Sequence, residues 1–228
     1  MLDRHQLLAL LEEKQRRAEG RKFFEYYPDE GPLRRELYAK HMAFFAAGKI
    51  HRERAAMAAN RVGKTEGIGA YEVTCHLTGQ YPHWWPGRKF EKPVNCLAGG
   101  DTATTTRDIL VSKLLGPKEA RGTGMVPRDS LGKPVPAPGV RDHVDYVPVR
   151  HERGGWSILQ FRSYDQGREA WQGTERDIGW CDEEPPEPVY TELLLRTATT
   201  NGMIIATFTP LNGLTDVALG FMPELAPA

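Results

Sequence analysis

The sequence lacks the features that mark a membrane, secreted or disulfide-bonded protein. No apolar run approaches the roughly 18 residues that a membrane-spanning helix needs. The three cysteines are far apart and form no C-x-x-C pair, so the pattern indicates neither a disulfide framework nor a zinc site and fits a reducing cytoplasm. The first twenty residues are too charged for a secretion signal. They predict an amphipathic helix with these leucines partly inward: Leu7, Leu8, Leu10 and Leu11.

Net charge is absent as well. The 30 Lys and Arg residues balance the 30 Asp and Glu residues, which argues against a protein that coats nucleic acid through bulk charge. A local basic patch is compatible with this balance. With 228 residues, 40% of them hydrophobic, the chain suits one large soluble domain, or a domain with a small appendage, and is long enough to bury a real core.

Strand and helix patterns alternate along the sequence. Helices are expected up to residue 48, with a break at 26–32, and again at 65–78 and 101–116. The segments that read as strands are 53–60, 93–100, 156–164, 177–184 and 202–210. Segment 116–148 is rich in Pro and Gly and is expected to be mostly loop. This alternation predicts an α/β fold with a mostly parallel sheet and helices on both faces.

A phosphate-binding motif lies between the first strand and the helix that follows it. The stretch AANRVGKT, residues 58–65, ends with the Gly-Lys-Thr of a phosphate-binding loop (Walker A), but Ala58 stands where the usual pattern has glycine. Such a loop needs a strand, a tight turn and a helix N-terminus in this order, and the sequence provides them. Taken alone, this motif fits an ordinary strand-to-helix turn about as well as it fits a phosphate-binding loop.

An acidic strand end supplies a second element. Asp182, Glu183 and Glu184 follow an apolar strand, and three adjacent carboxylates repel one another unless something positive lies there. Magnesium-ATP supplies that charge, with one carboxylate on the metal and one activating the attacking water (Walker B). Either Glu183 or Glu184 can be the base by this argument. A solvated acidic turn before prolines is the alternative.

A third strand ends in hydroxyl residues. Thr207 and Thr209 in the stretch IIATFTP can present hydrogen-bonding groups to a γ-phosphate, although a plain strand followed by a turn at Pro210 fits as well. A phosphate loop, an acidic strand end and a polar strand end in this order are much less expected by chance than any one of them. Together they predict a P-loop NTPase.

The sequence resembles the ATPase domain of the terminase large subunit, the DNA-packaging motor of tailed bacteriophages. The resemblance rests on AANRVGKTEGIGAYEV, SYDQGREAWQG, WCDEEPPEPVYTELLLRT and ATFTPLNG, with softer support from GTGMVP. In this family the first glycine of the phosphate loop is commonly replaced, so Ala58 is typical of it. The resemblance implies a P-loop fold of the additional-strand, catalytic-glutamate type. It also implies an N-terminal helical segment at 1–48 that packs on an ATPase core at 49–228.

The family's functional positions carry over onto this sequence. The resemblance implies ATP and Mg²⁺ as cofactors, with Lys64 on phosphate, Thr65 and Asp182 on the metal, and Glu183 as the catalytic carboxylate. Arg61 lies where family members have an arginine that senses the γ-phosphate. The remaining nucleotide-contacting positions are Tyr38, Asn60, Val62, Gly63, Thr207 and Thr209, of which the two threonines belong to the motif that couples hydrolysis to movement.

The resemblance also implies partners. These are double-stranded DNA, the portal protein of the procapsid, the small terminase subunit and further copies of the chain in a ring, in the cytoplasm of the infected host and without a membrane. A neighbouring subunit is expected to contribute an arginine, with Arg107, Arg162 and Arg168 as candidates. Apart from the resemblance, segment 116–148 has a local excess of basic residues, and contacts to DNA phosphates are expected among Lys118, Arg121, Arg128 and Lys133; a solvated loop with surface charges is the alternative.

Family members continue into a nuclease domain, which this chain is expected to lack, so nuclease activity is not predicted. Two other functions are compatible with the same motifs. One is a different P-loop NTPase, such as a helicase-like enzyme, whose additional nucleic-acid motifs are not found in the sequence. The other is a nucleotide-dependent assembly or portal-docking module with little turnover.

Overall fold

The structure is a computed structural model of the chain, and it describes residues 21–139, 142–211, 213 and 215–222. The helix predicted within residues 1–20 lies outside the described residues. No helix in the described ranges is both long and apolar enough to cross a membrane.

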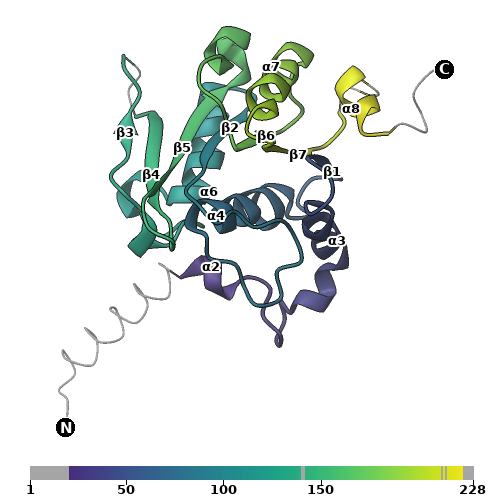
Figure 1. Cartoon of the computed structure of the whole chain (residues 1–228), viewed down its shortest axis with the longest axis vertical. Helices are drawn as coiled ribbons and strands as arrows, with labels where there is room; N and C mark the ends of the chain where they lie inside the picture. The colour runs from purple at the N-terminus through teal and green to yellow at the C-terminus, as the bar shows by residue number, and fades with distance from the viewer. Residues whose placement is uncertain (1–20, 140–141, 212, 214, 223–228) are drawn as a thin grey trace.

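A seven-stranded sheet forms the centre of the described chain, in the order β1-β7-β6-β2-β5-β4-β3 (Figure 1). The strands are β1 (Glu53–Met57), β2 (Asn95–Gly100), β3 (Val135–Pro136), β4 (Val144–Arg150), β5 (Trp156–Ser163), β6 (Ile178–Asp182) and β7 (Met203–Phe208). Neighbours from β1 to β5 are parallel, whereas β4 and β3 add an antiparallel edge. The predicted mostly parallel sheet is confirmed.

The position of β7 brings the three predicted motifs together. β7 lies between β1, which leads into the phosphate loop, and β6, which ends at Asp182. The register pairs Met57 with Phe208 and Asp182 with Thr207. Because carboxyl ends of parallel strands meet at one edge, the phosphate loop, the acidic residues and the hydroxyl residues share one edge of the sheet.

Helices cover both faces of the sheet, as predicted (Figure 1). Their bounds are α2 (Lys22–Glu25), α3 (Ala39–Ala47), α4 (Tyr71–Thr78), α5 (Ala103–Thr105), α6 (Ser112–Leu115), α7 (Glu187–Ala198) and α8 (Asp216–Gly220). Two π-helical segments, η2 (Lys64–Ala70) and η3 (Thr106–Val111), join the loop to α4 and α5 to α6. Short 3₁₀ segments are η1 (Arg35–Tyr38), η4 (Lys118–Ala120), η5 (Arg128–Ser130), η6 (Tyr164–Gln166) and η7 (Arg168–Trp171).

The core divides according to the two faces of the sheet. One cluster packs α2, α3, α4 and α6 against residues such as Ala98, Trp180 and Ile205. The other packs α7 and α8 against alternate positions of the same strands, such as Leu97 and Ile204. This alternation is expected from the period of two in a strand, so the central strands are apolar on both sides.

Two sequence-based boundaries differ from the structure. The described residues of segment 116–148 are mostly loop, as predicted, but the end of the segment overlaps β4, because Val144 to Pro148 belong to a strand whose Val147 side chain is buried. The many Pro and Gly residues before β4 conceal its alternating pattern in the sequence. In addition, the helix expected at 33–48 starts as the 3₁₀ turn η1 and becomes α-helical only at Ala39.

Candidate functional site

The phosphate loop follows β1 and turns without strain at Ala58. The backbone N–H of Ala58 donates to the Phe208 carbonyl at 3.3 Å, which continues the pairing of β1 with β7. Left-handed φ angles occur later in the loop, at Arg61 (65°) and Gly63 (87°), and not at Ala58. The position at which the usual motif has glycine therefore does not need glycine's freedom here, and Ala58 is compatible with the turn.

Lys64 lies inside the loop with only 6% of its surface exposed. Its ammonium group donates to the carbonyl oxygens of Ala58 (2.9 Å) and Ala59 (2.8 Å) and to the Thr209 hydroxyl (2.8 Å). Thr209 also lies 2.8 Å from the Asn60 amide oxygen. All of these partners are uncharged, so the positive charge of Lys64 is held in place but not neutralised.

Asp182 is the buried carboxylate of the site, with 5% of its surface exposed. Its Oδ1 accepts a hydrogen bond from the Thr207 hydroxyl at 2.8 Å. Burial raises the pKa of Asp182 to about 6, while hydrogen bonds from the hydroxyls of Thr207 and Thr65 oppose this rise. Lys64 and Asp182 form no ion pair with each other, although the attraction of the ammonium group also lowers the pKa of this carboxyl.

The two glutamates after Asp182 have different environments. Glu183 is exposed, has a left-handed φ of 70°, and its backbone N–H donates to the Thr207 carbonyl at 3.0 Å. Such a conformation is costly for a residue other than glycine and is found preferentially at functional sites. Glu184 is half-buried, and its carboxylate accepts a hydrogen bond from Thr215 at the start of α8. Glu183 is thus the glutamate whose side chain is available at the sheet edge.

The other residues predicted to contact the nucleotide are exposed on the loop or lie farther from it. Arg61 and Val62 are exposed on the loop. Tyr38 packs against the rings of Tyr27 (5.4 Å) and His41 (5.3 Å), and His41 is the residue that lies next to the loop, where a Cβ atom at Gly63 would be 3.3 Å from its ring.

Two tyrosines that the sequence analysis did not single out hold the site from outside. The Tyr27 hydroxyl lies 2.7 Å from both the Gly67 carbonyl oxygen and His41 Nδ1, which ties the N-terminal segment to the helix after the loop. The Tyr164 hydroxyl donates toward the Glu183 carbonyl at 2.9 Å. Tyr164 belongs to the SYDQGREAWQG stretch, so its place in a family block was the only available signal.

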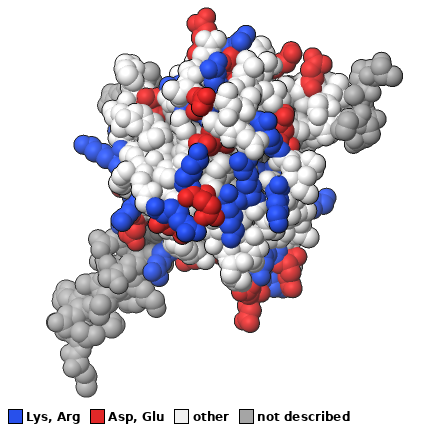
Figure 2. All heavy atoms as spheres, viewed as in Figure 1, with Lys and Arg blue, Asp and Glu red and all other residues white. Residues whose placement is uncertain are grey.

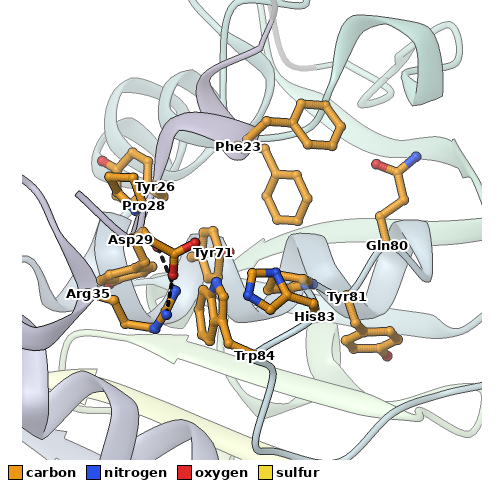
Figure 3. Close-up of a pocket in the computed structure, with 13 residues that line it drawn as sticks. Phe23, Tyr26, Pro28, Asp29, Arg35, Tyr71, Gln80, Tyr81, His83 and Trp84 are labelled. Atoms are coloured by element: carbon orange, nitrogen blue, oxygen red, sulfur yellow. Dashed lines mark hydrogen bonds and ion pairs between the residues drawn. The ribbon is translucent and has the colours of Figure 1, made fainter. Parts of the chain in front are cut away.

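A cavity of about 390 Å³ lies apart from this site (Figure 3). Aromatic rings line it, among them Phe23, Tyr26, Tyr71 and Trp84, and an ion pair between Asp29 and Arg35 lies at its side. None of its lining residues belongs to the phosphate loop or to the strand ends. The candidate site is therefore located by its hydrogen bonds and buried charges, and not by the volume of this cavity.

The three candidate arginines for a neighbouring site differ in how they are held. Arg162 donates to Asp145 (2.5 Å) and to the carbonyls of Phe161 and Ala170. Arg107 is paired with Asp108 (2.6 Å), and Arg168 with Glu192 (2.9 Å) while 51% of its side chain is exposed. The structure brings none of them to Lys64 of the same chain.

The residues at the sheet edge fit a magnesium ion held mainly by its nucleotide. In the described ranges no cluster of three or more His, Cys, Asp or Glu side chains forms a metal site by itself. Mg²⁺ is usually held by one or two carboxylates together with substrate phosphates. Asp182 is a buried carboxylate without a cationic partner, and the Thr65 hydroxyl is close enough to lower its pKa, so a carboxylate and a hydroxyl are available as ligands.

Comparison with known proteins identifies the family. Residues 55–227 match the family model "Terminase large subunit, T4likevirus-type, N-terminal". The large terminase subunit of Salmonella phage P22 is 35% identical over 95% of this chain, and the match covers 46% of that protein. The chain therefore spans about half the length of this curated relative.

A solved structure shows the same fold. The large terminase of a thermophilic bacteriophage matches 84% of this chain and 38% of its own, with a TM-score of 0.50 at 13% identity. The ATPase domain of the Thermus phage P74-26 large terminase matches 74% of this chain and 64% of its own, with a TM-score of 0.48 at 17% identity. The sequence match over most of the chain shows that it belongs to the terminase large subunit family, in the region that forms the N-terminal part of these proteins.

Proposed function

We propose that this chain is the ATP-hydrolysing motor domain of a terminase large subunit and that it drives double-stranded DNA into a procapsid. The observation that carries this proposal is the state of Lys64 and Asp182. Both are buried at one sheet edge, and uncharged groups hold both. A bound phosphate would neutralise Lys64, and the magnesium ion that accompanies it would neutralise Asp182. Membership of the terminase family independently favours such a ligand.

The roles of the side chains follow from their positions. Lys64 would move from the loop carbonyls to the outer phosphates, and Thr65 and Asp182 would hold Mg²⁺, which when bound neutralises charge on the transferring phosphoryl group. Glu183 would orient and deprotonate the attacking water, because its carboxylate is free at the strand end. Arg61, Asn60 and the remaining loop positions would surround the γ-phosphate.

Assembly would complete the site. We expect a ring in which Arg107 or Arg168 of one copy reaches the phosphates of its neighbour, since Arg162 is fixed by Asp145 and two carbonyls. An arginine supplied in this way is worth ~10³-fold or more in rate in related enzymes. The isolated domain should therefore hydrolyse ATP slowly, and its specific activity should rise with protein concentration or on a portal-bearing capsid. The portal protein and the small terminase subunit are the further partners, in the host cytoplasm.

DNA contact is proposed for the basic residues before β4. Lys118 forms an ion pair with Asp142, Arg121 donates to the Gly116 carbonyl, and Arg128 and Lys133 are exposed. Figure 2 shows basic side chains at the edge of the molecule that carries β3 and β4, with acidic side chains among the basic ones across this face. Phosphate contacts of this kind carry no sequence information and weaken strongly with salt.

Turnover assays test the proposal. ATP hydrolysis by the full chain would be measured with and without Mg²⁺ and double-stranded DNA, at several protein concentrations. We expect Mg²⁺-dependent hydrolysis that DNA stimulates, and a loss of that stimulation when Arg128 and Lys133 are replaced by glutamate. Binding of ATP without any turnover under all conditions, including an assembled capsid, would instead favour a nucleotide-dependent docking module.

Mixing experiments test the shared site. Neither a Lys64→Ala chain nor an Arg168→Ala chain should be active alone, but a mixture should regain part of the activity. At some interfaces in the mixture, the Arg168→Ala chain supplies an intact Lys64 and the Lys64→Ala chain supplies an intact Arg168. The same mixture with Arg107→Ala tests the other candidate. No rescue with either arginine variant, together with concentration-independent activity, would contradict a ring with shared sites.

A further inference from the structure

A chain of hydrogen bonds connects a buried tryptophan to Asp182. The indole N–H of Trp180 donates to the Thr207 hydroxyl at 2.9 Å, and that hydroxyl donates to Asp182 Oδ1 at 2.8 Å. Trp180 and Thr207 are fully buried. Trp180 and Asp182 are two residues apart on β6, so their side chains share the face on which Thr207 of β7 lies.

The direction of this chain is fixed by chemistry. An indole N–H can only donate, whereas a threonine hydroxyl has one proton and can also accept. Because Thr207 accepts from Trp180, its single proton is left for Asp182 Oδ1, and the competing acceptor, the Cys181 carbonyl, lies farther away at 3.4 Å. The indole N–H therefore keeps the threonine proton pointing away from the ring, and Asp182 Oδ1 is the nearer of the two acceptors that remain.

The same indole touches the helix that follows the phosphate loop. A Cβ atom at Gly69 would lie 2.3 Å from two ring carbons of Trp180, far closer than side chains approach each other. Only glycine fits there, so η2 packs directly on the ring. Thr65 lies on the same helical segment, close enough to Asp182 that its hydroxyl lowers the pKa of that carboxyl. Trp180 thus sets both the spacing between η2 and β6 and the orientation of the carboxylate between them.

We propose that Trp180 is a positioning residue for the metal site: it orients the Asp182 carboxylate through Thr207 and keeps Thr65 at the correct distance from it. In this role Trp180 acts through Thr207 and η2 and does not itself bind the nucleotide or the metal. The proposal rests on the proposed function, because it assumes that Thr65 and Asp182 hold Mg²⁺. Outer partners that orient a metal ligand typically change metal affinity by about 10–100-fold when they are removed.

The alternative is that Trp180 only fills the core. Another buried tryptophan provides the matched control: Trp171 is also fully buried, its indole N–H donates to the Ser163 carbonyl at 3.2 Å, and its ring packs on Tyr164 (5.5 Å) without a hydrogen bond into the chain that ends on the Asp182 carboxylate. Trp180→Phe and Trp171→Phe remove the same group and a similar volume. Only the first interrupts the chain that ends on the carboxylate.

The experiment is equilibrium binding of a fluorescent ADP to the full chain, in EDTA and across a Mg²⁺ titration, together with the free energy of unfolding of each variant. We expect Trp180→Phe to leave binding in EDTA unchanged and to raise the Mg²⁺ concentration needed for tight binding by about 10-fold or more. Trp171→Phe should lose stability without this shift. Thr207→Val should reproduce the shift, and the double variant with Trp180→Phe should add little, because both changes break one chain.

A near-isosteric replacement covers the case in which Trp180→Phe does not fold. Benzothienylalanine at position 180 replaces the N–H by sulfur and keeps the ring volume, and it should give the same Mg²⁺ shift. An unchanged Mg²⁺ titration in this variant, or an equal shift in Trp171→Phe, would overturn the proposal. Wild-type chain that binds nucleotide without any effect of Mg²⁺ would instead refute the metal site itself, and with it the proposed function.

Discussion

Two groups of buried charges lie toward opposite ends of β1, and they are satisfied in opposite ways. Near the start of the strand, Arg54 donates to both carboxylate oxygens of Glu72, at 2.7 and 3.1 Å, and His76 lies 3.3 Å from the same carboxylate. Beyond its carboxyl end, Lys64 and Asp182 are equally buried but are held by carbonyls and hydroxyls.

The difference shows how to separate structural from functional charges. Charges that neutralise each other inside a protein are complete without a ligand, and breaking such a pair leaves one ion uncompensated. Charges that neutral groups hold remain available for a ligand of opposite charge. The Arg54 cluster should therefore matter for stability, and the Lys64–Asp182 edge for nucleotide chemistry.

Lys64→Ala should have the largest effect on hydrolysis. Removing the loop's buried cation takes away the charge that would stabilise the outer phosphates, so turnover should fall by about 10²-fold or more. The free energy of unfolding should change little, because the partners of Lys64 are uncharged. Steady-state ATPase assays and urea unfolding measure both, with the exposed Lys49→Ala as control. If the Lys64→Ala chain were much less stable than the wild type but hydrolysed ATP normally, Lys64 would be a structural charge and not a functional one.

Glu183→Gln and Glu184→Gln form a matched pair. The first should keep Mg·ATP binding and lose about 10²-fold or more in turnover, since an amide cannot accept the proton of water. The second should keep most turnover and loosen the contact with Thr215 of α8. Binding and single-turnover hydrolysis would be measured for both variants. A greater loss of turnover in Glu184→Gln would place the base one residue later.

At the other charge cluster, Glu72→Gln should lower stability and spare chemistry. The change leaves the Arg54 guanidinium buried without its carboxylate, which costs about 3–5 kcal/mol in comparable sites. Urea unfolding measures the loss, and hydrolysis per folded molecule should stay near the wild-type value. Val73→Ala, in the same helix, serves as an uncharged control for a core defect. A stability change below that of ordinary surface substitutions would show that the pair is not structural.

The histidine of this cluster predicts a smaller, pH-dependent effect. Burial lowers the pKa of His76 below its usual 6.5, despite the nearby Glu72 carboxylate. The unfolded chain therefore binds a proton that the folded chain does not, so stability should fall as pH drops through about 6.5. His41 and His151 are shifted in the same direction by burial. Urea unfolding at pH 7.5 and 5.5 should show a smaller difference in His76→Gln than in the wild type, and an equal difference would contradict this.

The sequence allowed the sheet class and the order of the three motifs to be predicted, because the apolar strands and the Gly-Lys-Thr, Asp-Glu and Thr signals are local. It did not reveal β4, whose pattern is hidden among prolines and glycines. Nor did it show that Trp180 reaches Asp182 or that Tyr27 contacts the helix after the loop, since these contacts join residues on different elements. The distinction between Glu183 and Glu184 likewise needed the contact with Thr215, more than thirty residues away along the chain.

A crystal structure of the chain with Mg²⁺ and a non-hydrolysable ATP analogue would show whether the Lys64–Asp182 edge binds nucleotide. We expect the Lys64 ammonium to leave the carbonyls of Ala58 and Ala59 for the outer phosphates, with the metal beside Thr65 and Asp182. The Arg54–Glu72 pair should be unchanged. Nucleotide bound elsewhere, for instance in the aromatic cavity of Figure 3, with Lys64 still on the loop carbonyls, would contradict this expectation.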